Sequence, residues 1–438
     1  MTLILAAWFI ATPTQTPHRD WGVRVVDGDI TATGPHATLL VDYPNDDVVH
    51  AFNHVLMPGF VNAHTHTYGV LAHGIPLANA PSGFWSFLDD FWWPKIEDVL
   101  DHDMIVAATD WACYEMLRSG VTSFYDILEA PFAIPDALLA QKELVEARGL
   151  RGLLSFEATE RVSAANGQLG LLENRRLIEA CRHDASLVGG LMCYHTTFTC
   201  SAPFIEQAFA LGHELGVNVH AHCNEGTHEA QWCLDNIGQR TVEYYDTLGV
   251  LSNRFLASQC VQLSERERML LATHDVQCVH MPLANCEVGG GIAPVPELLA
   301  LGTNVALGSD GYINDFFEVM RGAFLLHKGR LCDPGVMPAA TVLYMATEAG
   351  AHALGFNRVG RLEPGWAADL QLVDARFPTP VHSHNLYDQL VLYRNHTHVT
   401  DVMVAGKWRV RNREVLALDT EVMRARVHEQ AERLWASA

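Results

Sequence analysis

The sequence predicts an α/β protein: a (β/α)8 TIM barrel with a small β-sandwich domain built from both chain ends. Three observations lead to this prediction. Apolar β-runs alternate with helical stretches over about 300 residues, which is the pattern of a (β/α)8 barrel. Shorter strand-like segments lie before and after that region. Polar side chains that can bind a metal recur at the ends of the β-runs, where such barrels carry their active sites.

Residues 1–57 are predicted to form the first part of the small β-domain. Alternating and apolar stretches indicate short strands separated by turns, at 3–12, 21–35, 36–44 and 54–59. The opening "MTLILAAWFIATPTQ" lacks a basic segment and runs into the alternating "GVRVVDG". We therefore interpret it as a β-strand rather than a signal peptide.

The barrel is predicted to span residues 58–360. Its β-runs lie at 59–64, 121–127, 151–158, 187–195, 216–223, 255–261, 276–282 and 303–310. Helical stretches between them include 103–120, 134–149, 204–216, 264–274 and 294–302, and several end in glycine, as helices commonly do. A doubly wound open sheet is the alternative. It would normally carry a glycine-rich phosphate turn, and neither GxGxxG nor a Walker A sequence is present.

Residues 361–438 are predicted to complete the small β-domain and to end in a helix that begins near residue 419. Strand-like pieces return at 367–374 and 399–412. Each of the two end regions is too small to bury a core alone, so we expect them to meet in one domain.

Composition excludes several classes of function. The formal net charge of −22 argues against nucleic acid and anionic membranes as partners, because both attract basic surfaces. No apolar run approaches the ~20 residues that a membrane helix needs. Ten cysteines occur with no CxxC pair, which indicates reduced thiols and a cytoplasmic protein. The absence of GxSxG and PCxxC argues against a serine hydrolase and against the zinc cytidine-deaminase family.

The segment "FVNAHTHTYG" places His64 and His66 one residue apart after an apolar run. On a β-strand such residues face the same way, so both imidazoles can converge on one point. His-x-His occurs four times in this chain of 23 histidines, so the tripeptide alone proves nothing. The pairs at 382/384 and 396/398 lie outside the predicted barrel and are expected to have no metal role. For His64 and His66 the alternative is a pair of satisfied core histidines.

Polar residues stand at nearly every predicted strand end. They are His64, His66, Glu157, His195, His220, His222, Gln259, His280 and Asp310. Histidine and carboxylate together are ligands that suit Zn²⁺, and also Fe²⁺.

Four stretches carry a resemblance to a known family. "LMPGFVNAHTHTYG", "GVNVHAHCNE", "VALGSDG" and "VGRLEPGWAADLQLVD" resemble the amidohydrolase superfamily, and more narrowly its cytosine deaminase and chlorohydrolase branch. The resemblance runs from about residue 50 to the end in the family's order. "SFEATERVSAANG" and "GSDGYINDFFEVMRGAFLLHK" are similar to an aminohydrolase group linked to purine breakdown.

The resemblance implies a mononuclear metal site. It assigns one divalent ion, Zn²⁺ or Fe²⁺, to His64, His66, His222 and Asp310, and the acid/base role to Glu225. Such a site lowers the pKa of a bound water to about 7. Asp310 can then accept a proton while Glu225 protonates a ring nitrogen or the leaving group. Binuclear relatives carry a carboxylated lysine on strand 4, and residues 187–195 contain no lysine.

Substrate contacts are expected from His195, Gln259, Glu157 and Tyr68. The resemblance places His195 against the substrate, the alternative being a packing role. Tyr68 follows the metal pair and is expected to line the pocket, and Glu157 lies at a strand end that faces the mouth. The aromatic stretch 81–98 is either a lid over a flat heterocycle or a packing or dimer contact.

Gln259 is the point at which the chain departs from the family pattern. The family normally reads "AHCVHL" at the end of strand 6, and this chain reads "SQCVQL". A glutamine amide can donate a hydrogen bond but cannot be protonated. The substrate could need a neutral donor and acceptor, the protein could be a catalytically weakened paralogue, or the strand register could be shifted.

The expected function is that of a metal-dependent hydrolytic deaminase acting on an amino-substituted nitrogen heterocycle. Close relatives remove chloride or alkylamine at the same kind of site, so the leaving group is not decided by the ligands. The substrate is expected to be a small molecule. Similar proteins are often homodimers, so a homodimer is expected here.

Overall fold

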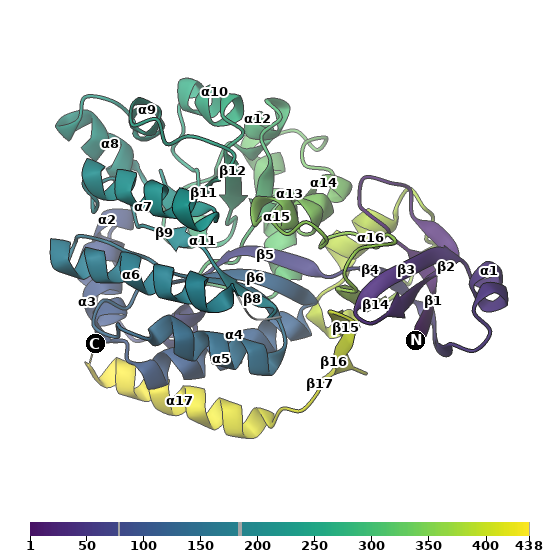
Figure 1. The fold of residues 1–438 in the computed structure, drawn as a ribbon. Coiled ribbons are helices and arrows are strands. Elements are labelled where there is room, and N and C mark those ends of the chain that lie inside the picture. The colour runs from purple at the N-terminus through teal and green to yellow at the C-terminus, as the bar shows by residue number, and fades with distance from the viewer. Residues whose placement is uncertain (78, 183–185, 438) are drawn as a thin grey trace. The chain divides into compact units, whose positions relative to one another are not determined.

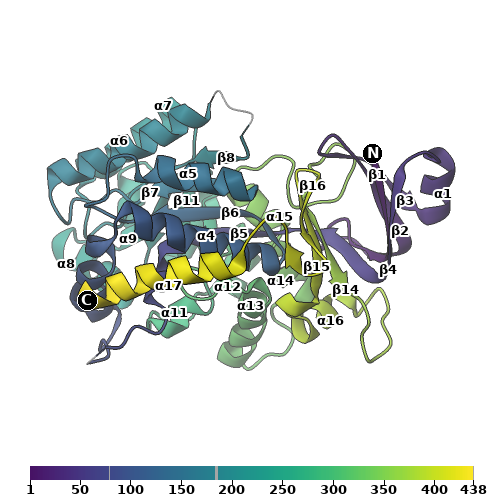
Figure 2. The same cartoon turned by 90° about the horizontal axis from the view of Figure 1, so that it is seen from below.

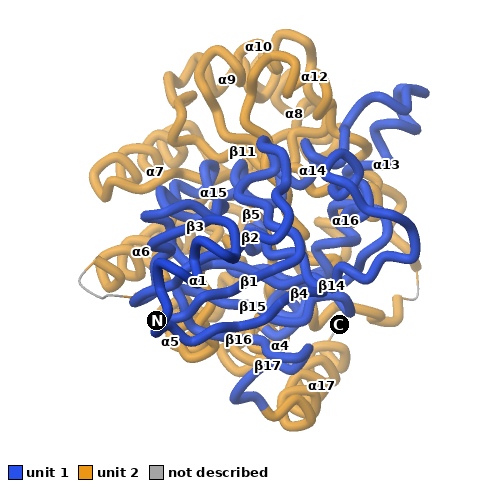
Figure 3. The backbone as a smooth tube through the Cα atoms, turned by 90° about the vertical axis from the view of Figure 1, so that its right-hand side faces the viewer, with its two compact units in different colours: residues 1–62, 114–123, 314–418 blue, residues 63–113, 124–313, 419–438 orange. Residues whose placement is uncertain are grey.

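A computed structural model describes residues 1–77, 79–182 and 186–437. The chain divides into two compact units (Figure 3). Unit 1 comprises Met1–Asn62, Tyr114–Ser123 and Asn314–Leu418, and unit 2 comprises Ala63–Cys113, Phe124–Ile313 and Asp419–Ala438. The three-part domain division with boundaries at 57/58 and 360/361 stays a prediction.

Unit 1 contains one eight-stranded sheet to which both ends of the chain contribute. Its order is β17-β16-β15-β14-β4-β1-β2-β3. The strands are β1 (Thr2–Phe9), β2 (His18–Val26), β3 (Asp29–Pro35), β4 (Asp47–Pro58), β14 (Leu370–Asp374), β15 (Val399–Val404), β16 (Lys407–Arg411) and β17 (Glu414–Val415). The junction between the two ends is the antiparallel pair β4–β14, in which Leu56 lies opposite Leu372.

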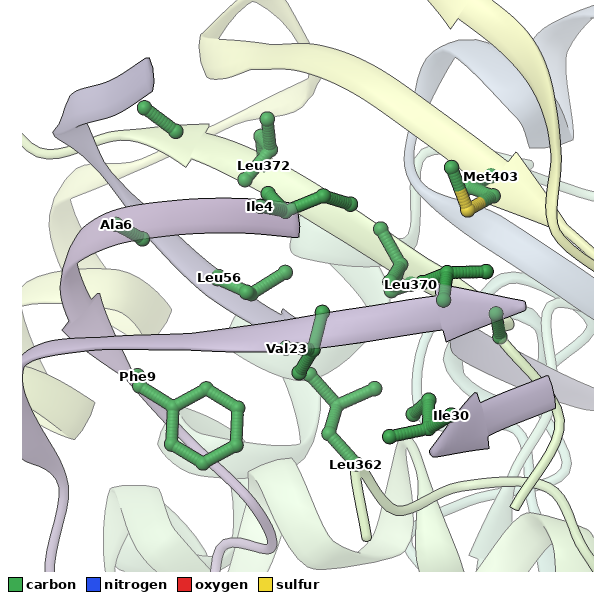
Figure 4. Packing of buried hydrophobic residues seen from close by; sticks show 13 residues of the cluster. Ile4, Ala6, Phe9, Val23, Ile30, Leu56, Leu362, Leu370, Leu372 and Met403 are labelled. Atoms are coloured by element: carbon green, nitrogen blue, oxygen red, sulfur yellow. The ribbon is translucent and has the colours of Figure 1, made fainter. Parts of the chain in front are cut away.

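The core of unit 1 explains one wrong prediction. Ile4 and Ala6 of β1 pack in a cluster with Val23, Leu56 and Leu370 (Figure 4). Because side chains alternate along a strand, Leu3 and Leu5 face the other side of the sheet. That side is covered by Leu39. The stretch 36–44 was predicted as a strand but forms helix α1 (His36–Asp42), which begins after Pro35 and supplies this cover.

The remaining helices of unit 1 come from residues 316–393, and the first three of them lie within the predicted barrel region 58–360. They are α13 (Phe316–Leu331), α14 (Ala339–Met345), α15 (Glu348–Ala353) and α16 (Leu386–Tyr393). Asp315 caps α13 by accepting a hydrogen bond from the backbone N–H of Phe317. An N-terminal aspartate satisfies a donor that the helix itself cannot pair.

Two parallel sheets carry the strands of the predicted barrel (Figure 1). One has the order β5-β6-β7-β8, and the other β13-β12-β11-β10-β9. The strands are β5 (Phe60–Thr65), β6 (Val121–Leu128), β7 (Arg151–Phe156), β8 (Val188–Gly190), β9 (Met192–Cys193), β10 (Val219–Cys223), β11 (Phe255–Gln259), β12 (Gln277–His280) and β13 (Val305–Leu307). All eight predicted β-runs therefore form strands, and the run at 187–195 is divided between β8 and β9.

Two isolated parallel bridges link these sheets within unit 2. Thr65 pairs with Asp310, and Ala158 pairs with Tyr194. Ser309 and Asp310 also donate backbone hydrogen bonds to the carbonyl oxygen of His64. The C-terminal end of β5 is thus held beside the segment that follows β13.

Helices alternate with the strands of unit 2. They are α4 (His102–Arg118), α5 (Ala137–Arg148), α6 (Ala164–Cys181), α7 (Ala202–Leu215), α8 (Thr227–Asn236), α9 (Thr241–Thr247), α10 (Glu265–Thr273), α11 (Ala284–Glu287), α12 (Val295–Ala300) and α17 (Thr420–Ser437). As predicted, glycines in the left-handed conformation end α5 and α7. The C-terminal helix α17 lies beside α4, with the Arg424 guanidinium over the Trp111 ring (Figure 2).

The aromatic stretch after β5 is helical in short pieces. It comprises a 3₁₀ turn η1 (Thr67–Ala72), α2 (Phe84–Ser86), a π-helical turn η2 (Phe87–Trp92), α3 (Trp93–Lys95) and η3 (Glu97–Val99). π-Helical turns are rare and occur often at functional sites. Among the described residues, every helix is too short or too polar to cross a bilayer.

Candidate metal centre and cavity

Three histidines converge at the C-terminal ends of β5 and β10, within unit 2. His64 belongs to β5, and His66 follows it with an extended backbone, so the two side chains share one face. Their Nε2 atoms lie 3.3 Å apart. His222 of β10 brings its Nε2 to 3.3 Å from that of His66. All three side chains are buried.

These spacings match a tetrahedral metal site. Zinc–imidazole bonds of 2.0–2.1 Å in tetrahedral geometry place ligand nitrogens about 3.3 Å apart. Asp310 completes the group, with carboxylate oxygens 3.8 Å from His66 Nε2 and 3.9 Å from His64 Nε2. The arrangement can hold one divalent ion between three imidazoles and a carboxylate.

Oxygen atoms that face the Nδ1 atoms of two rings set the tautomers of those rings. His66 Nδ1 lies 2.8 Å from the carbonyl oxygen of Ile127, and His222 Nδ1 lies 2.5 Å from Glu157 Oε1. Carbonyl and carboxylate oxygens only accept, so both Nδ1 atoms carry the hydrogen. In a neutral imidazole this leaves the lone pair on Nε2, which is the atom that would coordinate a metal ion.

The Glu157 contact also alters the charge on His222. Burial alone would lower the pKa of His222, but the carboxylate of Glu157 outweighs burial and raises it to about 9. In return, and against the effect of its own burial, Glu157 has a lowered pKa because His222 and His195 face it. Glu157 thus remains ionised and orients a proposed metal ligand.

Asp310 is held by two hydrogen bonds. Its Oδ1 accepts from the backbone N–H of Gly311 and its Oδ2 accepts from Gln259 Nε2, both at 2.7 Å. Gln259 lies at the end of β11 with a positive φ of 73°. The residue that departs from the family pattern therefore contacts the proposed carboxylate ligand and also lines the cavity.

Glu225 faces the same cavity, in the turn after β10. Burial, followed by the nearby charge of Asp310, raises the pKa of Glu225 to about 8. A carboxyl group with this pKa carries a proton at neutral pH and can donate it.

His195 and Tyr68 occupy different positions relative to the cavity. His195 lines it, and burial lowers the pKa of His195 to about 3, so the ring is neutral. Tyr68 was expected to line the pocket, but it is not among the described lining residues; its hydroxyl donates to Glu97 Oε1 at 2.8 Å. Tyr68 is thus connected to the cavity by its hydrogen bond to Glu97, and Glu97 does line the cavity.

A buried charge network beside the metal centre could not be predicted from the sequence. Arg161 forms ion pairs with Glu129, with Asp98 at 2.8 Å and with Glu97 at 3.4 Å. Burial raises the pKa of Glu97, and it raises that of Glu129 to about 7. The partners are far apart in the chain, and no motif in the sequence links them.

The cavity has a volume of about 790 Å³. Polar residues at the metal centre line one part, and aromatic residues of the 84–93 segment line another. Trp93 lies edge-on to His195 with ring centroids 5.8 Å apart. This contact connects the aromatic part of the cavity wall with the polar part.

Comparison with known proteins defines the class. Residues 55–409 match the model of the amidohydrolase family, and the chain belongs to that family. A 5-methylthioadenosine/S-adenosylhomocysteine deaminase of Syntrophobacter fumaroxidans is 33% identical over 414 residues, which cover 92% of this chain and 91% of that protein. A 5'-deoxyadenosine deaminase of Methanothermobacter thermautotrophicus is 34% identical over 384 residues, 85% of this chain and 86% of that protein.

A solved structure agrees in fold over almost the entire chain. An adenosine deaminase from Xanthomonas campestris with bound zinc has a TM-score of 0.88 and 28% identity, covering 99% of this chain and 98% of that one. The family prediction is confirmed, and so is that of a hydrolase acting on C–N bonds. The histidine cluster and the zinc-bound neighbour together support a divalent metal site.

The contact between Glu157 and His222 leads to a prediction about metal affinity. Glu157→Gln should weaken divalent metal binding about 10- to 100-fold in the high-pH limit, where no proton competes for His222, because the ring loses its charged orienting partner. Competition with a chromophoric chelator measures this directly. Glu160→Gln is the matched control, since Glu160 accepts from the backbone N–H of Ser201 instead. Equal affinities of Glu157→Gln and wild type would contradict the prediction.

Proposed function

We propose that this protein is a metal-dependent aminohydrolase that deaminates an amino-substituted nitrogen heterocycle of the aminopurine type. The observation that carries the proposal is the convergence of three imidazole Nε2 atoms beside Glu225 in one cavity. The deaminase names of relatives 33–34% identical over most of the chain support the same chemistry.

In this proposal His64, His66, His222 and Asp310 hold the metal ion, which we take to be zinc because the spacing of the imidazoles suits tetrahedral coordination. Such an ion, when bound, acidifies a coordinated water to a pKa near 7 and supplies the nucleophile. Fe²⁺ accepts the same ligands and is the alternative.

The proton transfers fall to two carboxyl groups. Glu225, protonated at neutral pH, donates to a ring nitrogen and so lowers the cost of attack on the adjacent carbon. Asp310 is the proton acceptor, and its hydrogen bonds to Gln259 and Gly311 keep it in place. The neutral ring of His195 contacts a polar atom of the substrate.

The remaining residues of the proposal are Gln259, Glu157 and Tyr68. We propose that Gln259 acts as a neutral donor tuned to this site, since its amide already bonds Asp310. Glu157 lines the cavity and contacts the substrate there. The same carboxylate also orients His222. Tyr68 supports Glu97 at the cavity wall.

The proposal also covers the fold, the oligomeric state and the cellular location of the protein. It keeps the closed (β/α)8 barrel over 58–360, supported by the bridges Thr65/Asp310 and Ala158/Tyr194, and a small β-sandwich domain from 1–57 and 361–438. It also keeps a homodimer and a cytoplasmic location, the latter supported by ten free cysteines.

The first test is ammonia release from metal-loaded protein across amino-substituted purines, pyrimidines, pterins and triazines. Turnover is expected on at least one ring system and should fall about 10²- to 10⁴-fold in Glu225→Gln, because the proton donor is lost. It should also be lost in His66→Ala and kept in His274→Ala, a surface histidine.

Because the acid form of Glu225 is lost as pH rises through about 8, kcat should decline above that pH. Ammonia release that survives Glu225→Gln would contradict the assigned role, and silence across the panel would point to another leaving group.

The second test concerns Gln259. Gln259→His should lower kcat/KM about tenfold or more, because a shorter ring that can be protonated replaces the neutral amide bonded to Asp310. Gln207→His, on an exposed face of α7, is the control. A large gain in kcat/KM would instead identify the protein as a weakened paralogue restored by the family's histidine.

A further inference from the structure

The cavity is larger than the ring that the metal centre would process. At about 790 Å³ it lies in the upper part of the range of ~300–1,000 Å³ found for pockets that enclose drug-sized ligands. A bare bicyclic heterocycle would leave most of this volume to water, at about 30 Å³ per molecule. Water is poorly accommodated where the walls offer few hydrogen-bonding partners.

The unused part of the cavity has aromatic walls. A chain of ring contacts leads away from the metal centre: His66 to Tyr68 at 5.5 Å between centroids, and Tyr68 to Trp92 at 6.0 Å. Trp92 then stacks on Phe87 at 5.3 Å with an interplanar angle of 24°, and Phe91 lies 5.7 Å from Phe87. Of these rings, Phe87, Phe91 and Trp92 line the cavity.

Phe84 places a further aromatic wall beside the proton donor. Gly226 follows Glu225, and a Cβ at Gly226 would lie 2.6 Å from Phe84 Cδ1. The ring therefore packs directly on the backbone next to Glu225, and Phe84 lines the cavity as well. Phe84 and Phe87 are half-buried, so their rings keep surface available for a ligand.

The charged residues further restrict which ligands the aromatic part of the cavity can bind. Carboxyl groups line the cavity at Glu97, Glu157, Glu225, Glu287 and Asp310. Arg161, a buried cation beside this compartment, is already paired with Glu97, Asp98 and Glu129. An anionic substituent would therefore gain no new ion pair with Arg161, whereas a neutral flat group would stack on the rings.

We propose that Phe84, Phe87, Phe91 and Trp92 form an aromatic subsite for a flat, uncharged substituent carried by the amino-heterocycle. The inference rests on the proposed function for the orientation of the heterocycle toward the metal centre. The substrate class is thus an amino-heterocycle with an aryl or similarly apolar appendage, in preference to one with a carboxylate or phosphate.

The experiment measures equilibrium binding and turnover separately. Binding of 9-benzyladenine, 9-(carboxymethyl)adenine and adenine to the metal-loaded Glu225→Gln chain is measured by titration calorimetry, and ammonia release is measured with the wild type. The benzyl compound should bind at least about tenfold more tightly than the other two, the gain expected from aromatic stacking with area burial. Equal affinities, or no binding of the benzyl compound, would overturn the subsite.

A matched pair of variants locates the effect. Trp92→Ala should remove most of the preference for the benzyl compound and leave adenine binding little changed. Trp85→Ala is the control: it removes the same side chain from the same segment, but Trp85 stacks on His228 and does not line the cavity. Trp92→Phe should restore part of the preference. Loss of the preference in Trp85→Ala, or its persistence in Trp92→Ala, would overturn the proposal.

The two readouts separate this inference from the proposed function. Aryl-selective binding without ammonia release would support the subsite and contradict deamination. Ammonia release from all three compounds with no aryl preference in binding would support deamination and overturn the subsite.

Discussion

The tightest constraint in this structure is the close approach of three imidazole nitrogen atoms in the interior of the protein. The Nε2 atom of His66 lies about one tetrahedral edge from those of His64 and His222, and the Nδ1 atoms of His66 and His222 face oxygen acceptors, which leaves Nε2 for a metal ion. A divalent cation is the ligand that this arrangement of nitrogen atoms suits. The rest of the unit can be understood as the framework that holds these groups in place and supplies the carboxyl groups around them.

Each supporting group comes from a different strand end. The carbonyl of Ile127 in β6 orients His66, Glu157 after β7 orients His222, and Gln259 at the end of β11 holds Asp310. Parallel strands bring these ends to one edge, which is why residues far apart in sequence meet there. The aromatic segment that follows β5 adds apolar walls next to this polar edge. One cavity therefore contains both the proposed catalytic groups and a surface that can bind an apolar group.

Much of this could be predicted from local pattern. The spacing of His64 and His66 follows from the two-residue period of a strand, and the eight apolar runs were recognisable as strands because they are buried on both faces. The stretch 36–44 was mistaken for a strand because its apolar residues serve to cover Leu3 and Leu5, a need that exists only once the sheet has formed. The bond between Glu157 and His222, and the pairing of Arg161 with Glu97 and Glu129, depend on tertiary contacts that leave no signature in local sequence.

The most direct test of this account is the metal content of the purified full-length chain and of His222→Ala, measured by inductively coupled plasma mass spectrometry after removal of loosely bound ions. The account predicts close to one equivalent of a divalent transition metal per chain in the wild type and its loss in the variant, with the fold retained by circular dichroism. A wild-type chain that binds no metal, or a variant that keeps a full equivalent, would contradict it.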